Sequence, residues 1–500
     1  PEQGRGTGRR DAGRRVAGGR MRSRRFVFVL VLIALVVAAL ASGRASSAPP
    51  RQVPNAKVAP SASVLAASST VWFCPGLPAA LPHGSARVTF ANIGDATADV
   101  VITDLADNGS ASDVTLEVPP DSVVTKARDR LGAPGALTVE TFGGRVLVEE
   151  GIESSAALES TPCATQTSPH WYFAAGTTPR GVQQWLVIDN PYASDAKVDV
   201  TLRTSSGVRR PDALQGLDIA RRSREVIAIH DIAVREDRVA VEVDTEVGSV
   251  VAAQTLVYTR AAGTPGVALS IGSPVAASEW TFAGAVVERG SSARVAIANV
   301  GGDDAQVTVQ ATPESTKQVL VPTSLTVAQD DVAWVQLGQC GAPSSKACIN
   351  IPAGLRYSLD IRSEQNIAIV AQTLTRFDDA PDVVGTVTSP GAFAAARGWA
   401  FARSRVNGEA ATTLSFFNPG ADAAVVGVGL VHDGRVERPR PLQAVTVPPG
   451  RAVTVTVVGG RKPSTRDAAL TIDATEPIFV DRTIVATGEA ASSVGVVVSG

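Results

Sequence analysis

The chain has 500 residues, 44% of them apolar and 19% charged, a composition typical of globular proteins and not of disordered chains. Its length exceeds what one hydrophobic core normally supports, so we expect several domains. Removing residues 1–41 takes away nine Arg and two acidic residues and leaves 37 basic and 46 acidic residues, a net charge of about −9. This acidic balance excludes a protein that binds nucleic-acid phosphates.

The N-terminal segment has the layout of a secretory signal peptide. Residues 21–41 read MRSRRFVFVLVLIALVVAALA, in which three Arg precede an apolar run that ends in a small-residue cleavage site. Met21 is the single Met, so residues 1–20 are predicted to be a disordered upstream extension of the reading frame. We expect residues 21–41 to export the chain. The alternatives are an uncleaved membrane anchor and, least favoured, a buried core helix.

Residues 42–70 are rich in Ser, Ala and Pro and show no hydrophobic periodicity. This composition predicts an extended, disordered linker before the first folded domain. Together the N-terminal segments predict an extracytoplasmic protein, secreted or anchored to the cytoplasmic membrane through its N-terminal apolar segment only.

The rest of the chain is a fourfold internal repeat marked by a Trp and an Asn. Each Trp begins a short motif (WFC, WYF, WTF or WAF), and the Asn follows about twenty residues later between two strand-like runs. The markers are Trp72, Trp171, Trp280 and Trp399, and Asn92, Asn190, Asn299 and Asn418. The predicted repeats span residues 71–168, 169–277, 278–396 and 397–500.

Each marker Asn opens a stretch of Pro, Gly, Ser or Asp, where its side chain can bond its own backbone, so we predict a turn between strands. Roughly seven to nine short strands per repeat, with turns every 8–12 residues, are typical of an immunoglobulin-like β-sandwich. The predicted fold is therefore all-β, with four tandem immunoglobulin-like β-sandwich domains. The marker Trp lies on the first strand, and we expect it to pack at the junction between domains.

The four Cys predict two disulfides, in line with an exported chain. Cys74 stands where the other repeats have Phe, and Cys163 ends the last strand of the same repeat, so this pair would tie the first domain's ends together. Cys340 and Cys348 flank a short loop and are predicted to pair locally. The rival interpretation, a four-Cys metal site, lacks any C-x-x-C pair.

Residues with catalytic or metal-binding chemistry form no recognisable constellation. The four His occupy unrelated repeat positions, and neither a metal-binding His pair nor a nucleophile elbow occurs. Residues 104–113 carry oxygen ligands that Ca²⁺ could use, but their spacing fits no calcium loop, and Asn108-Gly109 favours a hairpin turn. We therefore predict no catalytic, cofactor-binding or metal-binding residue.

A polar residue recurs within an apolar strand late in each repeat. The tetrad AQTL occurs at 253–256 and again at 371–374, and aligning the repeats places Gln254 and Gln372 with Glu150 and Arg482. One shared reaction would not accept an acid, an amide and a cation at its key position. We therefore expect a structural polar site whose head groups reach backbone or solvent.

The signal segment, the Ser/Pro spacer and the repeats with W-x-F and Asn-Pro-Gly motifs resemble a family of exported actinobacterial envelope proteins of unknown function, built of tandem immunoglobulin-like sandwiches. The resemblance covers residues 21–500 and implies an envelope location, without catalytic residues to carry over.

We expect a non-enzymatic extracytoplasmic envelope protein without cofactors. It would act as a multi-domain scaffold or as a binding module for an envelope protein or cell-wall glycan. The alternative is a carbohydrate-active or other hydrolytic enzyme with its site at a domain junction, which a cleft lined by two carboxylates would favour.

Overall fold

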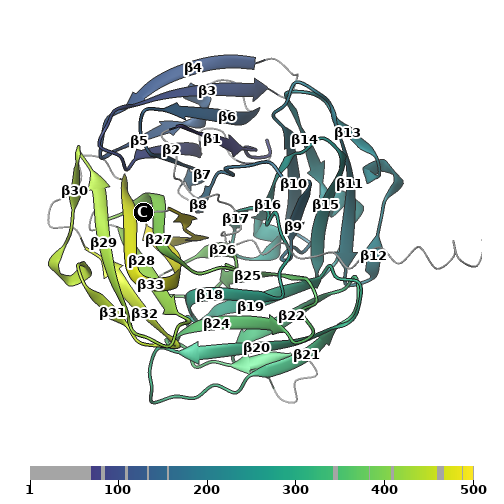
Figure 1. Cartoon of the computed structure of the whole chain (residues 1–500). Helices are drawn as coiled ribbons and strands as arrows, with labels where there is room; N and C mark the ends of the chain where they lie inside the picture. The colour runs from purple at the N-terminus through teal and green to yellow at the C-terminus, as the bar shows by residue number, and fades with distance from the viewer. Residues whose placement is uncertain are drawn as a thin grey trace, which may run out of the picture. The chain divides into compact units, whose positions relative to one another are not determined.

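The computed structural model describes residues 69–79, 81, 85–106, 111–131, 135–154, 157–341, 347–381, 383–406, 410–458, 467–486 and 488–498. The predicted extension 1–20, the signal or anchor segment 21–41 and most of the linker 42–70 lie outside the described residues, as does the predicted Asn108-Gly109 turn. Most of the described strands are labelled in Figure 1, and all of them belong to one compact unit. In these ranges no helix is both long and apolar enough to cross a membrane.

The described residues form an all-β protein in which each sheet takes its strands from one of four stretches of chain, called repeats 1 to 4 (Figure 1). In repeat 1, one sheet has the order β1 (Ser69–Cys74), β6 (Gly135–Phe142), β3 (Ala98–Ala106) and β4 (Ala111–Val118). The second sheet has the order β5 (Ser122–Ala127), β2 (Ala86–Asn92), β7 (Val146–Ser154) and β8 (Ala157–Pro162). All strand pairs in both sheets are antiparallel.

Repeats 2 and 3 also contain two sheets each. Repeat 2 has β14 (Ser223–Ala228), β10 (Val182–Asn190), β16 (Val251–Tyr258) and β17 (Gly266–Ile271) in one sheet. Its other sheet has β12 (Gly207–Arg209), β11 (Ala196–Thr204), β15 (Val239–Val247) and β9 (His170–Phe173), with β13 (Leu217–Ile219) beside β11. Repeat 3 has β18 (Glu279–Val286), β24 (Arg356–Ser363), β20 (Ala305–Pro313) and β21 (Thr323–Val327) in one sheet. Its other sheet has β23 (Cys348–Asn350), β22 (Val332–Gly338), β19 (Ser291–Asn299), β25 (Ile369–Phe377) and β26 (Gly385–Pro390).

In repeat 4, the long strand β33 (Asp467–Ala486) takes part in both layers. One layer has β30 (Arg435–Glu437), β29 (Ala424–His432), β27 (Ala396–Arg405), β35 (Val496–Val497) and β31 (Val445–Val447), and the other has β28 (Ala410–Asn418), β32 (Arg451–Val457) and β34 (Glu489–Val494). Short helical turns connect strands at η1 (Arg128–Arg130), η2 (Asp212–Leu214), α2 (Ile229–Ile232), η3 (Arg260–Ala262) and η4 (Arg440–Leu442).

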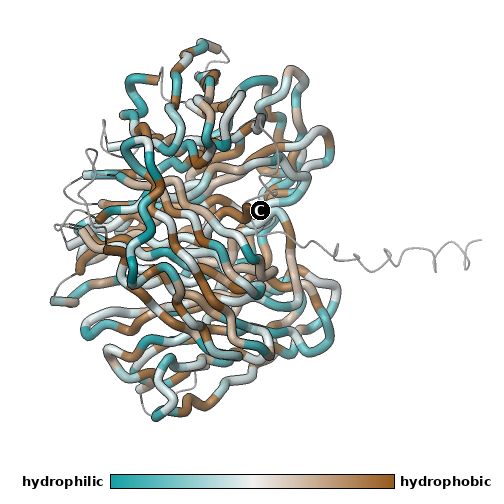
Figure 2. Tube along the Cα trace, turned by 60° about the vertical axis from the view of Figure 1, so that its left-hand side comes forward, coloured by the Kyte–Doolittle hydropathy of each residue, from teal (hydrophilic) through white to brown (hydrophobic). Residues whose placement is uncertain are grey.

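The two sheets of each repeat enclose a hydrophobic core. Along many strands hydrophobic and hydrophilic residues alternate (Figure 2), so that one face of the sheet is apolar. The four marker Trp are fully buried, each in the core of its own repeat. The expectation that they pack at the junctions is therefore wrong. The indole N–H of Trp171, Trp280 and Trp399 donates to the backbone carbonyl of Val250, Ile369 and Ile478, respectively, which fixes each ring inside the sandwich.

The marker Asn residues make the predicted turns and also tie the two sheets together. In each repeat the Asn Oδ1 accepts the backbone N–H two residues on, at 2.9–3.1 Å. Its Nδ2 donates both to the carbonyl four residues on and to a carbonyl that ends a strand of the other sheet. These three hydrogen bonds satisfy both donors and the acceptor oxygen of a buried amide, which explains why Asn recurs there.

Both predicted disulfides form, Cys74 with Cys163 and Cys340 with Cys348. The Cys74–Cys163 disulfide of repeat 1 stands where each of the other repeats has a Gly packed against its Trp and Phe rings. Gly272, Gly391 and Gly495 each lie so close to the Trp and Phe rings of their repeat that an added Cβ would come within about 3 Å of an aromatic carbon. In repeat 1 the Phe and the Gly are both replaced by Cys, and the disulfide fills the space.

The contacts between repeats close on themselves. One strand near the end of each repeat lies beside its counterparts: β8 contacts β17, β17 contacts β26, β26 contacts β34, and β34 contacts β8. The hydrophobic clusters cross these junctions, because the core of repeat 1 includes Ala402 and Val431 of repeat 4, and the core of repeat 3 includes Ala175 and Leu256 of repeat 2. We call the contact between repeats 4 and 1 the closing junction, since it joins the two ends of the series.

Candidate functional site

One strand in each repeat (β7, β16, β25 or β33) carries a buried polar side chain at one or both of two neighbouring positions. The strands align on residues that lie opposite the marker Asn or accept the Trp indole N–H: Val146, Val250, Ile369 and Ile478. The third residue after each of these forms an outer row, Glu149, Ala253, Gln372 and Asp481, and the fourth an inner row, Glu150, Gln254, Thr373 and Arg482. The inner row is paired with core residues, namely Val88, Leu186, Val295 and Leu414, and so lies on the core face of its sheet.

This register corrects the alignment of the AQTL tetrads. Glu150, Gln254 and Arg482 are equivalent, as the sequence indicated, but Gln372 belongs to the neighbouring row. Because successive strand residues point to opposite faces, the two Gln side chains leave opposite faces of their sheets despite identical flanking letters. These polar side chains are therefore structural, as expected, and the polar residues of the outer row form hydrogen bonds to the preceding repeat.

At the closing junction the two rows meet as a buried ion pair. Arg482 of repeat 4 donates from Nη1 to both carboxylate oxygens of Glu149 in repeat 1, each at 3.0 Å, and both side chains are at most 2% exposed. The Glu149 carboxylate also accepts the Ala402 backbone N–H at 2.7 Å and the Ser160 hydroxyl at 2.6 Å. Arg482 donates in addition to the Ser493 hydroxyl at 2.7 Å. The pair is thus hydrogen-bonded from several sides, which a buried salt bridge needs in order to be stable.

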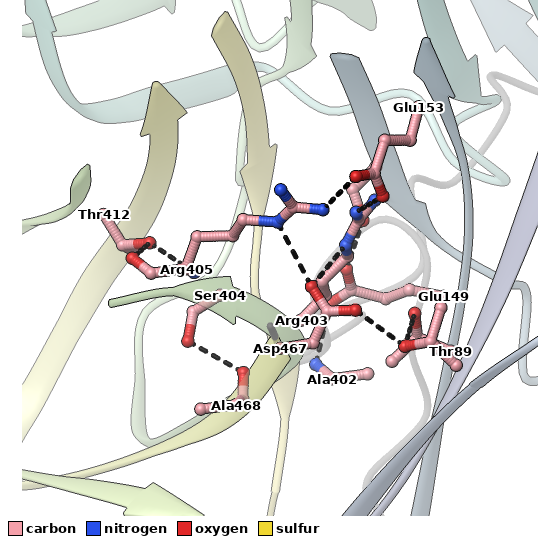
Figure 3. A network of polar contacts seen from close by, with 12 residues as sticks. Thr89, Glu149, Glu153, Ala402, Arg403, Ser404, Arg405, Thr412, Asp467 and Ala468 are labelled. Carbon is pink, nitrogen blue, oxygen red and sulfur yellow. Dashed lines mark hydrogen bonds and ion pairs between the residues drawn. The ribbon is translucent and has the colours of Figure 1, made fainter. Parts of the chain in front are cut away.

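A second set of ion pairs extends this network along the closing junction (Figure 3). Arg403 and Arg405 of repeat 4 each bind Glu153 of repeat 1, at 2.6 and 2.5 Å, and Asp467 of repeat 4, at 3.0 and 3.4 Å. Asp467 also accepts the Thr125 hydroxyl of repeat 1 at 2.8 Å. Burial opposes ionisation of Glu153 and Asp467, but the bonds and positive charges from these Arg outweigh it and lower the pKa of both carboxyl groups.

The junction between repeats 2 and 3 uses neutral amides in the same two rows. Gln254 Nε2 donates to the Ala175 carbonyl at 2.6 Å, and its Oε1 accepts from Gln184 at 2.9 Å. Gln372 of repeat 3 accepts the Ala175 backbone N–H at 3.1 Å and donates to the hydroxyls of Ser270 and Thr388, each at 3.0 Å. Both Gln side chains therefore hold the same peptide segment from opposite sides.

The junction between repeats 3 and 4 relies on one buried carboxyl group. Asp481 accepts the backbone N–H of Ala283 at 2.7 Å and that of Gly284 at 3.4 Å. Burial raises the pKa of Asp481 to about 7 although these hydrogen bonds oppose the shift. The outer row thus performs one task in three repeats, since Glu149, Gln372 and Asp481 each accept a backbone N–H from the first strand region of the preceding repeat.

The junction between repeats 1 and 2 lacks this hydrogen bond, because both the acceptor side chain in repeat 2 and the backbone donor in repeat 1 differ. The outer-row residue is Ala253, which has no acceptor, and the repeat 1 segment contains Pro75, which has no N–H. Arg224 of repeat 2 instead donates to the carbonyls of Pro75 and Leu77 at 3.1 and 3.2 Å. Donor and acceptor are therefore lost together, and an Arg supplies the contact.

Two carboxyl groups with raised pKa lie near this junction. Burial raises the pKa of Glu150 to about 7, against the opposing effects of Arg128, a backbone bond from Gly76 and Arg224. Burial also raises the pKa of Asp189 well above its usual range, and the Glu150 charge adds to the shift while Arg224 opposes it. A carboxyl group with a raised pKa can serve as a general acid, but both of these side chains are buried.

A small cavity lies where the four repeats meet. It is lined by residues of β8, β17, β26 and β34, among them Thr161, Ile271, Pro390 and Ser493, and measures about 10 Å³. That volume holds about one water molecule and no sugar ring. Among the described residues, no group of three His, Cys, Asp or Glu is placed to hold a metal ion.

The sequence located some of these residues and missed others. It singled out Glu150, Gln254, Gln372 and Arg482 as structural polar sites, and it missed Glu149, Asp467, Asp481 and the Arg403–Arg405 pair. The signal for the missed residues was charge inside apolar strands, as in VLVEEGI and IFVDRTI, but partners up to 333 residues apart cannot be paired from one sequence.

Three solved structures show weak similarity to this chain. A crystal structure of a tetra-tandem repeat in the extending region of a large adhesion protein is 11% identical, covers 86% of this chain and 98% of that one, and has a TM-score of 0.10. A glycoside hydrolase family 32 structure from Bifidobacterium adolescentis is 9% identical, with 83% and 99% covered and a TM-score of 0.14. An α-L-rhamnosidase of Streptomyces avermitilis complexed with L-rhamnose is 9% identical, with 82% and 57% covered and a TM-score of 0.10. Scores this low support no argument about fold or function.

No curated protein matches the chain in sequence. A family model does match it over residues 153–458, more than half of its length, and the description of that family is "Family of unknown function (DUF5719)". This match is in line with the sequence-based resemblance to a family of unknown function. The chain belongs to the DUF5719 family.

Proposed function

We propose that this chain is a non-enzymatic extracytoplasmic envelope protein, in which four immunoglobulin-like sandwiches act as a rigid scaffold or binding module for an envelope protein or cell-wall glycan. The observation that carries the proposal is the closing junction. Its buried Arg and acidic residues bind one another across repeats 4 and 1. Cores that run across junctions fix the repeats as one body, which suits a protein that presents surface loops at set positions.

The two disulfides indicate an oxidising, extracytoplasmic environment. Export through residues 21–41, with or without cleavage, is the finer part of the proposal. Protease treatment of intact cells tests it: an exported chain is digested from outside, whereas a chain protected until the cells are lysed would contradict export.

Binding is tested by co-sedimentation of the full chain with isolated cell-wall glycan, together with cross-linking to envelope proteins in intact cells. The binding-module proposal predicts a saturable association with one of these classes and no release of soluble sugar. Saturable binding to neither class, or release of reducing sugar from the glycan, would overturn it.

The second candidate, a hydrolytic enzyme with its site at the junction of repeats 1 and 2, is supported by Glu150 and Asp189. Burial raises the pKa of both carboxyl groups, a property of general acids. Because both groups are buried, the junction would have to open to admit substrate. Glycan hydrolysis by the full chain that falls at least about 100-fold in Glu150→Gln would establish this candidate, whereas undetectable hydrolysis would remove it.

A further inference from the structure

The exposed edge strand of one sheet differs in length and continuity among the four repeats. In repeat 1 this edge is β4, eight uninterrupted residues that pair with β3 from Ala98–Val118 to Leu105–Ala111. In repeat 2 the equivalent edge is split into β12 and β13, with η2 between them, and in repeat 4 into β30 and β31, with η4 between them. In repeat 3 the edge is β21, with five residues. Interrupted edges are protected from pairing with another chain, whereas β4 retains a long edge of this kind.

Strand β4 is the end of its sheet, and no other described strand pairs with its outer side. Its side chains alternate: Val114 and Leu116 are partly buried against the core of repeat 1, and Asp113, Thr115 and Glu117 are exposed. An added strand would therefore bond to the β4 main chain and place its apolar residues beside Val114 and Leu116.

The exposed face of this sheet is acidic. Strands β1, β3, β4 and β6 contain no Lys or Arg, and their exposed acidic residues are Asp99, Asp113, Glu117 and Glu140. Asp99 lies directly opposite Glu117, a like-charge pair that destabilises neighbouring strands. Arg128, which follows β5, is bound to Asp104 and to the Gly135 carbonyl, so it does not balance this face.

We propose that β4 is a docking strand for an extended segment of a partner protein in which basic and apolar residues alternate. The basic residues would lie beside Asp113 and Glu117 and relieve the repulsion between Glu117 and Asp99, and the apolar residues would extend the row of Val114 and Leu116. A second copy of this chain fits less well, because pairing two β4 strands would bring four acidic residues together, two from each strand. The inference rests on the binding-module proposal and specifies the protein partner's chemistry.

The test measures peptide binding to the full chain by fluorescence anisotropy at low salt. The probe is a labelled nine-residue peptide of alternating Lys and Val with blocked ends. Two comparison peptides have Glu in place of Lys, or N-methyl groups on every backbone nitrogen of the Lys peptide. We expect the Lys peptide to bind at least about tenfold more tightly than either, since the first loses charge complementarity and the second cannot pair as a strand.

Variants locate the site. Asp113→Lys with Glu117→Lys is expected to reverse the preference toward the Glu peptide, whereas the matched pair Ser324→Lys with Thr326→Lys on β21 leaves it unchanged. Equal binding of the N-methylated peptide, or an unchanged preference in the β4 variant, would overturn the docking strand. A peptide-free dimer that the β4 variant abolishes would assign the edge to a second copy instead. These results are independent of glycan co-sedimentation, so the docking strand can fail while the scaffold proposal stands.

Discussion

The closing junction and the junction between repeats 2 and 3 use side chains of the same two rows, and in both junctions these side chains bind the equivalent backbone segment of a repeat. The side chains are charged in the first junction and neutral in the second. Repeats 2 and 3 follow each other in the chain, and two neutral Gln side chains hold the shared peptide at Ala175. Repeats 4 and 1 are the two ends of the series, and there Arg482 and Glu149 form a buried ion pair within a larger network.

Covalent connection explains this difference. A short linker keeps repeats 2 and 3 at high effective concentration, so neutral hydrogen bonds are enough to set their register. The closing junction must select repeat 1 of the same molecule over other surfaces. A buried charge that meets a wrong partner stays unpaired at high cost, and we therefore interpret the ion pairs as a source of specificity.

The largest expected effect is at the closing junction. Glu149→Ala leaves Arg482 buried without its main partner, and we expect a loss of about 3–5 kcal/mol in the free energy of unfolding, measured by urea denaturation. The matched control is Glu279→Ala, because Glu279 pairs with Arg362 at 3.0 Å but both side chains are exposed. That change should cost less than about 1 kcal/mol. Equal losses in the two variants would show that the closing junction is not special.

The second expected effect is that the stability contributed near the junction of repeats 1 and 2 and at the closing junction depends on pH with opposite sign. The pKa of Glu150 is raised from 4.5 to about 7, so the folded state holds a proton there that the unfolded state releases. Its contribution therefore falls by about 3 kcal/mol as the pH rises from 4.5 to 7. The pKa values of Glu153 and Asp467 are lowered, so their contribution has the opposite sign: it is present above their unfolded values and is lost on acidification.

The measurement is the free energy of urea unfolding at pH 5 and pH 8 for the native chain and for Glu150→Gln. We expect the variant to lose the Glu150 part of this decline, about 2–3 kcal/mol, and to be more stable than the native chain at pH 8. The part that comes from Asp189 and Asp481, whose pKa values burial also raises, should remain. An unchanged pH dependence would show that Glu150 is ionised in the folded protein at neutral pH.

The smallest of these effects concerns the amide junction. Gln372→Ala leaves the Ala175 N–H buried without its acceptor, and we expect a loss of about 1–3 kcal/mol, measured by urea unfolding. Gln372→Glu keeps the acceptor and serves as the comparison at pH 5. If both variants lost less than about 0.5 kcal/mol, the outer row would not be a shared device for joining repeats.

Much of the fold could be predicted from the sequence because it is repeated. Trp and Asn recur at matched intervals, and each satisfies fixed backbone groups within its own repeat, so spacing alone revealed them. Cys74 was informative for the same reason, since it replaces a recurrent Phe. The side of each strand was harder to predict: AQTL sits one residue out of register between repeats, and letter identity hid the change of face.

The junctions could not be predicted because their chemistry does not repeat. Each outer-row residue is matched to a neighbour and not to its counterparts, as Ala253 is matched to Pro75 and Glu149 to Arg482. The core position of the marker Trp could not be predicted either, because a single sequence holds no signal that distinguishes a core aromatic from an interface aromatic at the start of a domain.

A double-mutant cycle on Glu149 and Arg482 tests most directly whether repeats 1 and 4 close on each other. Free energies of unfolding would be measured for the native chain, Glu149→Gln, Arg482→Met and the double variant. The closed arrangement predicts a coupling energy of about 1–3 kcal/mol between residues 333 positions apart, with the double variant more stable than the sum of single effects implies. Additivity within about 0.5 kcal/mol would contradict it, because side chains that do not touch do not couple.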